Sequence, residues 1–166
     1  MLAREHISDT LRHKQLVIES GLTIIHYLYE NHRDNEALQL ARRCARHDDS
    51  KLEFDEMQAF LQLPNEGENM KNANTPLSDG VTKLIQKHWA HNKHHPEFFK
   101  DYHEMTEIDI MEMVCDWHAR SKQYHTNFKE FVKTRQQIRF HFDDEFFAIV
   151  WKYCEIVDSS DPIEKV

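Results

Sequence analysis

The chain has 166 residues, of which 40% are hydrophobic and 30% charged, with only 3 glycines and 4 prolines; this is the composition of one globular domain rich in helices. Its formal charge of −8 argues against a broad surface for a nucleic-acid backbone, although a local cationic pocket for one phosphate stays open. No apolar run approaches the roughly 18 residues that could cross a membrane. The N-terminus, MLAREHISDT, lacks an apolar signal core, which predicts a cytoplasmic protein.

Hydrophobic periodicity predicts an all-α domain of about six helices over residues 1–166. The first helix is expected at residues 8–32. Its buried stripe is predicted from apolar residues at three- and four-residue steps: Leu11, Ile18, Leu22, Ile25 and Leu28. Gly21 weakens this helix slightly, which is tolerable where another helix packs closely against it. A second helix is expected from Asp34 or Asn35 to the His47-Asp48 pair.

A short third helix is predicted from Glu53 to Leu63. Residues 64–77 are polar and are expected to form the one long loop, which could act as a lid. A fourth helix is expected to begin at Ser78 or Asp79 and to end at Pro96.

The fifth helix is predicted to begin at Thr106, in a capping box with Asp109, and to run into the 120s. The last helix, Asp143 to Val157, is rich in aromatic residues, which usually belong to the core but could form a surface for a homo-oligomer. The expected domain core is residues 8–122, with a helical extension at 123–158.

The cysteines and histidines of the sequence lead to two further predictions about burial. Cys44, Cys115 and Cys154 stand apart among apolar neighbours, so buried free thiols are predicted. Histidine is the compositional outlier, with 13 residues. Those expected on the surface are His6, His32, His103, His125 and His141, with His26 a weak candidate for the interior.

The His47-Asp48 pair is the first candidate for chemistry. Adjacent helical residues point about 100° apart, yet an imidazole and a carboxylate near a helix end can share an ion. The alternative is an ordinary helix terminus with exposed polar residues. Mn, Fe, Co, Ni or Zn would suit this donor pair.

A histidine cluster lies in the predicted fourth helix. Four histidines fall within eight residues, and a metal or a phosphate is the expected ligand because buried histidines without partners are costly: His88, His91, His94 and His95. His88 falls on the apolar face, and Asn92 and His95 extend it at helical spacing.

The fifth helix supplies three carboxylates at three- and four-residue steps, Asp109, Glu112 and Asp116, within an apolar stretch. Such carboxylates should be paired or bound to a metal. His13 of the first helix shares a face with Val17 and can look inward.

The order of these residues resembles the HD superfamily of metal-dependent phosphohydrolases, which has a first-helix histidine, an H-D pair and a distant aspartate. The matching positions are His13, His47, Asp48 and Asp116. The segment H-D-D-S-K is similar to the H-D-x-G-K signature of the HD-GYP branch, with Ser50 in place of glycine. H-H-P-E is similar to that branch's H-H-E, with Pro96 inserted.

The chain resembles still more closely a small uncharacterised bacterial and phage family with the motifs H-x-x-x-N-x-H-H-P-E and E-M-x-x-D-W-x-A. The matching residues include His88, Asn92, His94, His95, Glu97, Glu112 and Asp116. This resemblance covers roughly residues 10–122. The chain lacks a G-Y-P motif, so hydrolysis of cyclic dinucleotides is not implied.

The resemblance implies a helical HD-like fold and a site with one or two divalent ions. His13, His47, Asp48 and Asp116 would bind the first ion. Water activated by Mn, Co, Ni, Fe, Zn or Mg would attack a small phosphorylated substrate such as a nucleotide. The resemblance further implies catalytic roles for Asp48, Lys51 and His94, and substrate or second-metal roles for His88, His91, His94 and His95. Asn92, Glu97 and Glu112 would orient the ligands.

Two other functions stay open at this point. A regulatory domain could keep the metal or phosphate ligands without chemistry. A di-iron oxygenase is the other reading, since some HD-type folds hold two irons.

Overall fold

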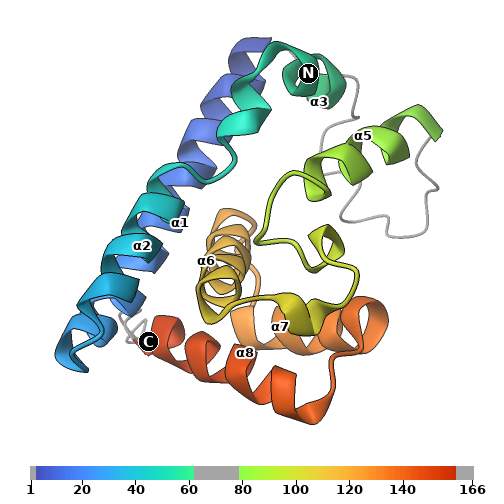
Figure 1. Ribbon diagram of the computed structural model, residues 1–166. Coiled ribbons are helices and arrows are strands. Elements are labelled where there is room, and N and C mark those ends of the chain that lie inside the picture. The colour runs from blue at the N-terminus through green and yellow to red at the C-terminus, as the bar shows by residue number, and fades with distance from the viewer. Residues whose placement is uncertain (1–2, 62–78, 160–166) are drawn as a thin grey trace.

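A computed structural model describes residues 3–61 and 79–159, and all the regular structure within these ranges is helical (Figure 1). The expected all-α class is therefore confirmed. Seven α-helices follow one another in the described parts of the chain: α1 (Ala3–Glu30), α2 (Asp34–Ala45), α3 (Phe54–Leu61), α5 (Asp79–Trp89), α6 (Glu107–Gln123), α7 (Phe128–Arg135) and α8 (Asp144–Asp158). The expected loop at 64–77 lies outside the described residues.

Helices α1 and α2 form a long antiparallel pair on one side of the molecule (Figure 1). Gly21 of α1 faces Cys44 of α2 so closely that a Cβ added at Gly21 would lie 2.6 Å from the Cys44 Sγ. The close helix approach expected at this glycine is thus present. It brings the end of α2, and with it the His47-Asp48 pair, against the middle of α1.

The buried face of α1 differs from the predicted stripe. Leu11 and Leu22 are 51% and 57% exposed, and only Leu28 of the predicted set is fully buried. The buried face instead mixes apolar with small and polar residues: His6, Thr10, His13, Val17, Ser20, Gly21, Ile24 and Leu28. The prediction from hydrophobicity alone therefore placed the wrong face of α1 inward. The face that is actually buried carries polar residues, which have partners inside the protein.

Helix α6 is the central element and packs against α1, α2, α7 and α8 (Figure 1). Every residue from Ile108 to Ala119 is buried. An apolar sequence on all sides of a helix is what a central position requires. The predicted capping box of Thr106 and Asp109 begins this helix. Asp109, Glu112 and Asp116 are therefore held inside the protein rather than along a solvated edge.

The C-terminal helices complete the same hydrophobic core. Asp143 caps α8 at the start expected from the sequence, and Phe146, Val150 and Tyr153 are buried. Helix α7 lies within the helical extension expected at 123–158 and contributes Phe128 and Val132 to the core.

Helix α5 ends at Trp89, so the prediction that it extends to Pro96 is wrong. The following residues form turns that lead into a short 3-10 helix at Pro96–Phe98. His94 and His95 consequently enter the interior from an irregular segment. Their approach depends on turn geometry and not on the helical spacing from His88.

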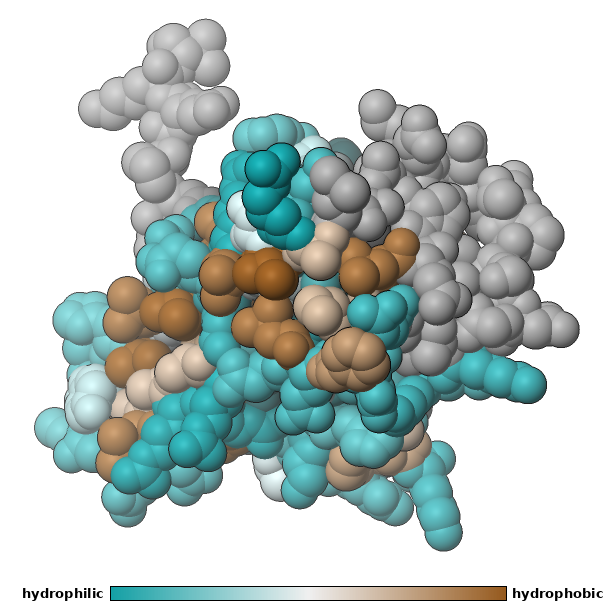
Figure 2. All heavy atoms as spheres, turned by 90° about the horizontal axis from the view of Figure 1, so that it is seen from above, coloured by the Kyte–Doolittle hydropathy of each residue, from teal (hydrophilic) through white to brown (hydrophobic). Residues whose placement is uncertain are grey.

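The three cysteines are buried and free, as expected. Among the described residues, no helix is both long and apolar enough to cross a membrane. The surface keeps several exposed apolar side chains, among them Leu11, Leu22, Tyr29, Leu38 and Phe54. The face drawn in Figure 2 shows apolar side chains gathered in a broken band beside a largely hydrophilic region.

Candidate metal centre

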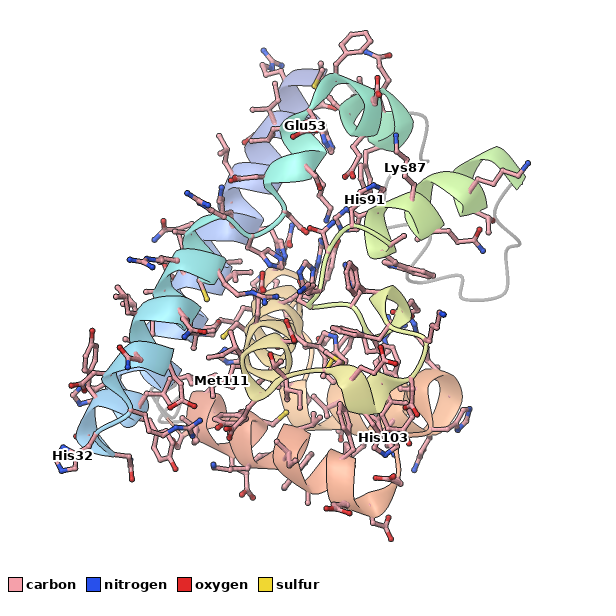
Figure 3. All side chains as sticks on the ribbon, viewed as in Figure 1. His32, Glu53, Lys87, His91, His103 and Met111 are labelled. Carbon is pink, nitrogen blue, oxygen red and sulfur yellow. The ribbon has the colours of Figure 1, made fainter. Side chains whose placement is uncertain are left out.

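Residues from four parts of the chain converge where α1, the end of α2, α6 and the segment after α5 meet. In Figure 3, nitrogen-bearing side chains crowd this region between α2, α6 and the residues that follow α5. The charged or polar side chains buried there include His13, His47, Asp48, His88, His94 and Asp116. His95 is half-buried beside them. Burial of so many polar groups calls for specific partners.

Asp48 reaches this region through an unusual backbone conformation. Helix α2 ends at Ala45, and Asp48 has φ 54° and ψ 25°, in the left-handed region. Aspartate tolerates this region better than most residues, although it still costs free energy. The turn removes the 100° divergence that a continuous helix would impose between neighbouring side chains. As a result, Nε2 of His47 lies 3.4 Å from Oδ2 of Asp48.

A first donor set consists of His13, His47 and Asp116, whose ligand atoms lie within 4.8 Å of one another. Nε2 of His13 lies 2.8 Å from Oδ1 of Asp116, and Nε2 of His47 lies 3.7 Å from the same oxygen. This set contains three of the four residues that the resemblance proposed for one ion.

Asp48 is the fourth of those residues, and it groups with the later histidines. The second donor set consists of Asp48, His88, His94 and His95, again with ligand atoms within 4.8 Å of one another. Oδ1 of Asp48 lies 3.2 Å from Nε2 of His88 and 3.6 Å from Nε2 of His94. Since Oδ2 of Asp48 faces His47, this carboxylate lies between the two sets.

Buried nitrogen and oxygen atoms that make no hydrogen bond indicate whether a cation fits this site. Six buried nitrogen or oxygen atoms of the two sets have no hydrogen-bond partner among the described residues: His13 Nδ1, His47 Nε2, Asp48 Oδ1, His88 Nε2, His94 Nε2 and His95 Nε2. Buried polar atoms without partners are rare in folded proteins. Imidazole and carboxylate donors suit Mn, Fe, Co, Ni or Zn. The residues therefore fit one or two such ions.

Glu112 supports two of these histidines from the other side. Nδ1 of His47 donates to Oε1 of Glu112 at 3.0 Å, and Nδ1 of His94 lies 3.4 Å from the same oxygen. The three residues also form a close group of possible ligands. Because Oε1 meets the Nδ1 atoms, we interpret Glu112 as orienting the rings so that Nε2 faces the donor sets.

Arg43 and Glu56 also support the ligands, and neither residue is predicted from the sequence to do so. Arg43 donates to Glu112 Oε2 at 2.6 Å. Nδ1 of His88 donates to Glu56 at 3.0 Å, and Asn92 donates to the backbone oxygen of His88 at 2.8 Å. No sequence signal separates Glu56 from an ordinary acidic residue in the first turn of a helix.

Burial and charge act in opposite directions on the histidines. Burial lowers the pKa of His13 to about 4 and the pKa of His95 well below its usual value. Burial also disfavours the charged form of His47, but the negative charge of Asp48 and the contacts of the ring with Asp116 and Glu112 together outweigh it and raise the pKa of His47. Two imidazoles that are neutral at neutral pH thus lie beside one that must release a proton to bind a cation.

The acidic members of the donor sets are ionised. Burial alone would raise their pKa values, but His47 beside Asp48 and the hydrogen bond from His13 to Asp116 hold both pKa values well below the usual range. Two negative charges are consequently available to a cation.

Lys51 is buried and its Nζ lies 2.6 Å from Oδ2 of Asp48. Its backbone oxygen meets Nε2 of His6 at 3.0 Å. The prediction that His6 is a surface residue is therefore wrong, since α1 packs this histidine against the segment after Asp48. Lys51 is the cationic group adjacent to the second donor set.

Two predicted site residues lie apart from the donor sets. His91 is exposed beside Lys87 near the end of α5 (Figure 3), and its Nδ1 donates to the Lys87 backbone oxygen at 2.6 Å. Glu97 is exposed and accepts a hydrogen bond from Arg139 at 3.0 Å, so it orients none of the histidines in this structure. Both were misplaced because the chain leaves the helix after Trp89.

Comparison with known proteins gives one match. A family model described as a family of unknown function (DUF5662) matches residues 2–156. No curated protein and no solved structure matches the chain.

Proposed function

The chain belongs to DUF5662, a family of unknown function, and from its buried centre we propose that it is a metal-dependent phosphohydrolase acting on a small phosphorylated molecule such as a nucleotide. One observation carries the proposal: the buried residues of two donor sets converge at Asp48, and six of their nitrogen and oxygen atoms make no hydrogen bond among the described residues. The resemblance of His13, His47-Asp48 and Asp116 to the HD superfamily supports the same reaction.

We assign the residues of the two donor sets to two ion positions. His13, His47 and Asp116 hold a first divalent ion, and Asp48, His88, His94 and His95 hold a second. When bound, such ions act as Lewis acids and lower the pKa of water for attack on phosphorus. Asp48 joins the two positions because its two oxygens face different histidines.

We assign Lys51 to binding the phosphate group of the substrate. Its ammonium group is buried next to Asp48, where it can donate hydrogen bonds to a phosphoryl oxygen and stabilise the charge that develops in the transition state. Histidine-rich ligation favours a transition metal over Mg²⁺, which prefers oxygen ligands.

The test combines metal content with turnover. Purified protein is analysed for Mn, Fe, Co, Ni and Zn beside the variants Asp48→Ala and His91→Ala, and each is assayed with a panel of phosphate esters. We expect bound metal and metal-dependent phosphate release in the native protein and in His91→Ala, and the loss of both in Asp48→Ala.

Two results would count against the proposal. Metal without turnover of any ester would favour a metal-binding regulatory domain, or a di-iron oxygenase if iron alone is found. No metal in the native protein, even after reconstitution, would remove the basis of the proposed site.

A further inference from the structure

One carboxylate touches both donor sets. Oε1 of Glu112 lies 3.0 Å from Nδ1 of His47, a member of the first set, and 3.4 Å from Nδ1 of His94, a member of the second. The planes of the two imidazole rings are inclined by 43°, and their centroids lie 4.3 Å apart. A rotation of the Glu112 side chain would therefore disturb one ligand of each ion position.

Glu112 is held firmly in place. Its second oxygen accepts a hydrogen bond from Nε of Arg43 at 2.6 Å, and the same guanidinium donates to Oδ1 of Asp109 at 2.6 Å. Asp109 is in turn fixed by the capping box with Thr106 at the start of α6. Arg43 belongs to α2 and Glu112 to α6, so the two helices together set the orientation of the carboxylate.

This arrangement determines which nitrogen each ring presents. An ionised carboxylate only accepts hydrogen bonds, so the proton of each facing imidazole is retained at Nδ1 and the lone pair is directed from Nε2 toward the donor sets. Both Nε2 atoms are buried and have no hydrogen-bond partner among the described residues. One acidic group thereby prepares a ligand for each of two positions.

Resting on the proposed function, we infer that Glu112, locked by Arg43, is a positioning residue that couples the two ion positions, so that the ions bind cooperatively. Binding of the first ion orders His47 against Glu112. The His94 ring shares Oε1 of Glu112 with His47 and lies 4.3 Å from the His47 ring, so an ordered His47 leaves His94 less freedom to lose when the second ion binds.

Glu56 provides a matched comparison. It makes the same kind of contact, a carboxylate oxygen 3.0 Å from an imidazole Nδ1, but its contact among the ligands is with His88 of the second set alone. Removal of its charge should weaken one position, whereas removal of the charge on Glu112 should weaken both.

The experiment is a calorimetric titration of metal-free full-length protein with Mn²⁺, comparing the native chain, Glu112→Gln and Glu56→Gln. The native protein is expected to bind two ions with positive cooperativity. Glu112→Gln should weaken both binding steps by about 10- to 100-fold, the range for loss of a group that orients metal-bound histidine. Glu56→Gln should weaken only one step.

If circular dichroism shows that Glu112→Gln fails to fold, the variant Arg43→Lys tests the same inference. Arg43 is partly exposed, and lysine keeps the charge but loses the fork that joins Glu112 to Asp109. A parallel weakening of both steps is expected. A native-like first step in Glu112→Gln or Arg43→Lys would overturn the coupling while leaving the proposed hydrolase intact; a native protein that binds no Mn²⁺ would overturn both.

Discussion

Nε2 of His13 lies 2.8 Å from Oδ1 of Asp116, although 103 positions separate the two residues in the sequence. The contact joins α1 to α6 inside the protein, where His13 is 2% and Asp116 8% exposed. It brings a neutral imidazole against an ionised carboxylate, and both belong to the first donor set. The stability of the fold and the chemistry of the site therefore depend on the same pair.

The His13 contact predicts how the stability of the metal-free protein depends on pH. Burial lowers the pKa of His13 from 6.5 to about 4, so the unfolded chain binds more protons than the folded one between these values. His13 should therefore lower the free energy of unfolding by about 3 kcal/mol as the pH falls through this window. In urea unfolding with a chelator, His13→Asn should lose less stability between these two pH values than the native protein. Parallel pH profiles would contradict the assignment.

Substitution of Gly21 by alanine should destabilise the fold without touching a ligand. The new Cβ would lie 2.6 Å from Sγ of Cys44, so either the Cys44 side chain or the two helices must shift. The expected cost is about 1–3 kcal/mol, typical of overpacking. Urea unfolding measures it, and the double variant Gly21→Ala, Cys44→Ala should recover much of the loss. If the stability losses of the two single substitutions simply add in the double variant, the Cys44 sulfur is not what the new Cβ collides with.

Lys51→Met should separate substrate binding from metal binding. If Lys51 binds phosphate, loss of its charged hydrogen bonds should raise the KM for a phosphate ester by about 10- to 100-fold. Metal content should persist, because Lys51 contributes no atom to either donor set. Inorganic phosphate should also inhibit this variant more weakly. An unchanged KM together with loss of metal would mean that Lys51 only holds Asp48 in place.

His91 and His95 offer a paired test of the second donor set. His95 belongs to it, whereas His91 is exposed and bonded to the backbone of Lys87. His95→Ala should bind one ion fewer than the native protein at moderate metal concentration, and His91→Ala should match the native protein. Elemental analysis after dialysis measures both. Equal losses in the two variants would argue against this donor set.

The sequence by itself determined the helical class and several helix boundaries. Thr106 and Asp109 cap α6, and Asp143 caps α8, because these caps are local contacts between residues three positions apart. The sequence also indicated His13, His47, Asp48 and Asp116 as ligands, through residue type and a resemblance in their order.

Only the tertiary structure decided how those residues meet. The inward rotation of α1, the left-handed turn at Asp48 and the end of α5 at Trp89 depend on packing between distant segments. That packing separated the histidines near position 90, since His94 and His95 turn inward while His91 stays exposed. It also supplied Arg43 and Glu56, whose roles arise from contacts across 69 and 32 positions that no local pattern encodes.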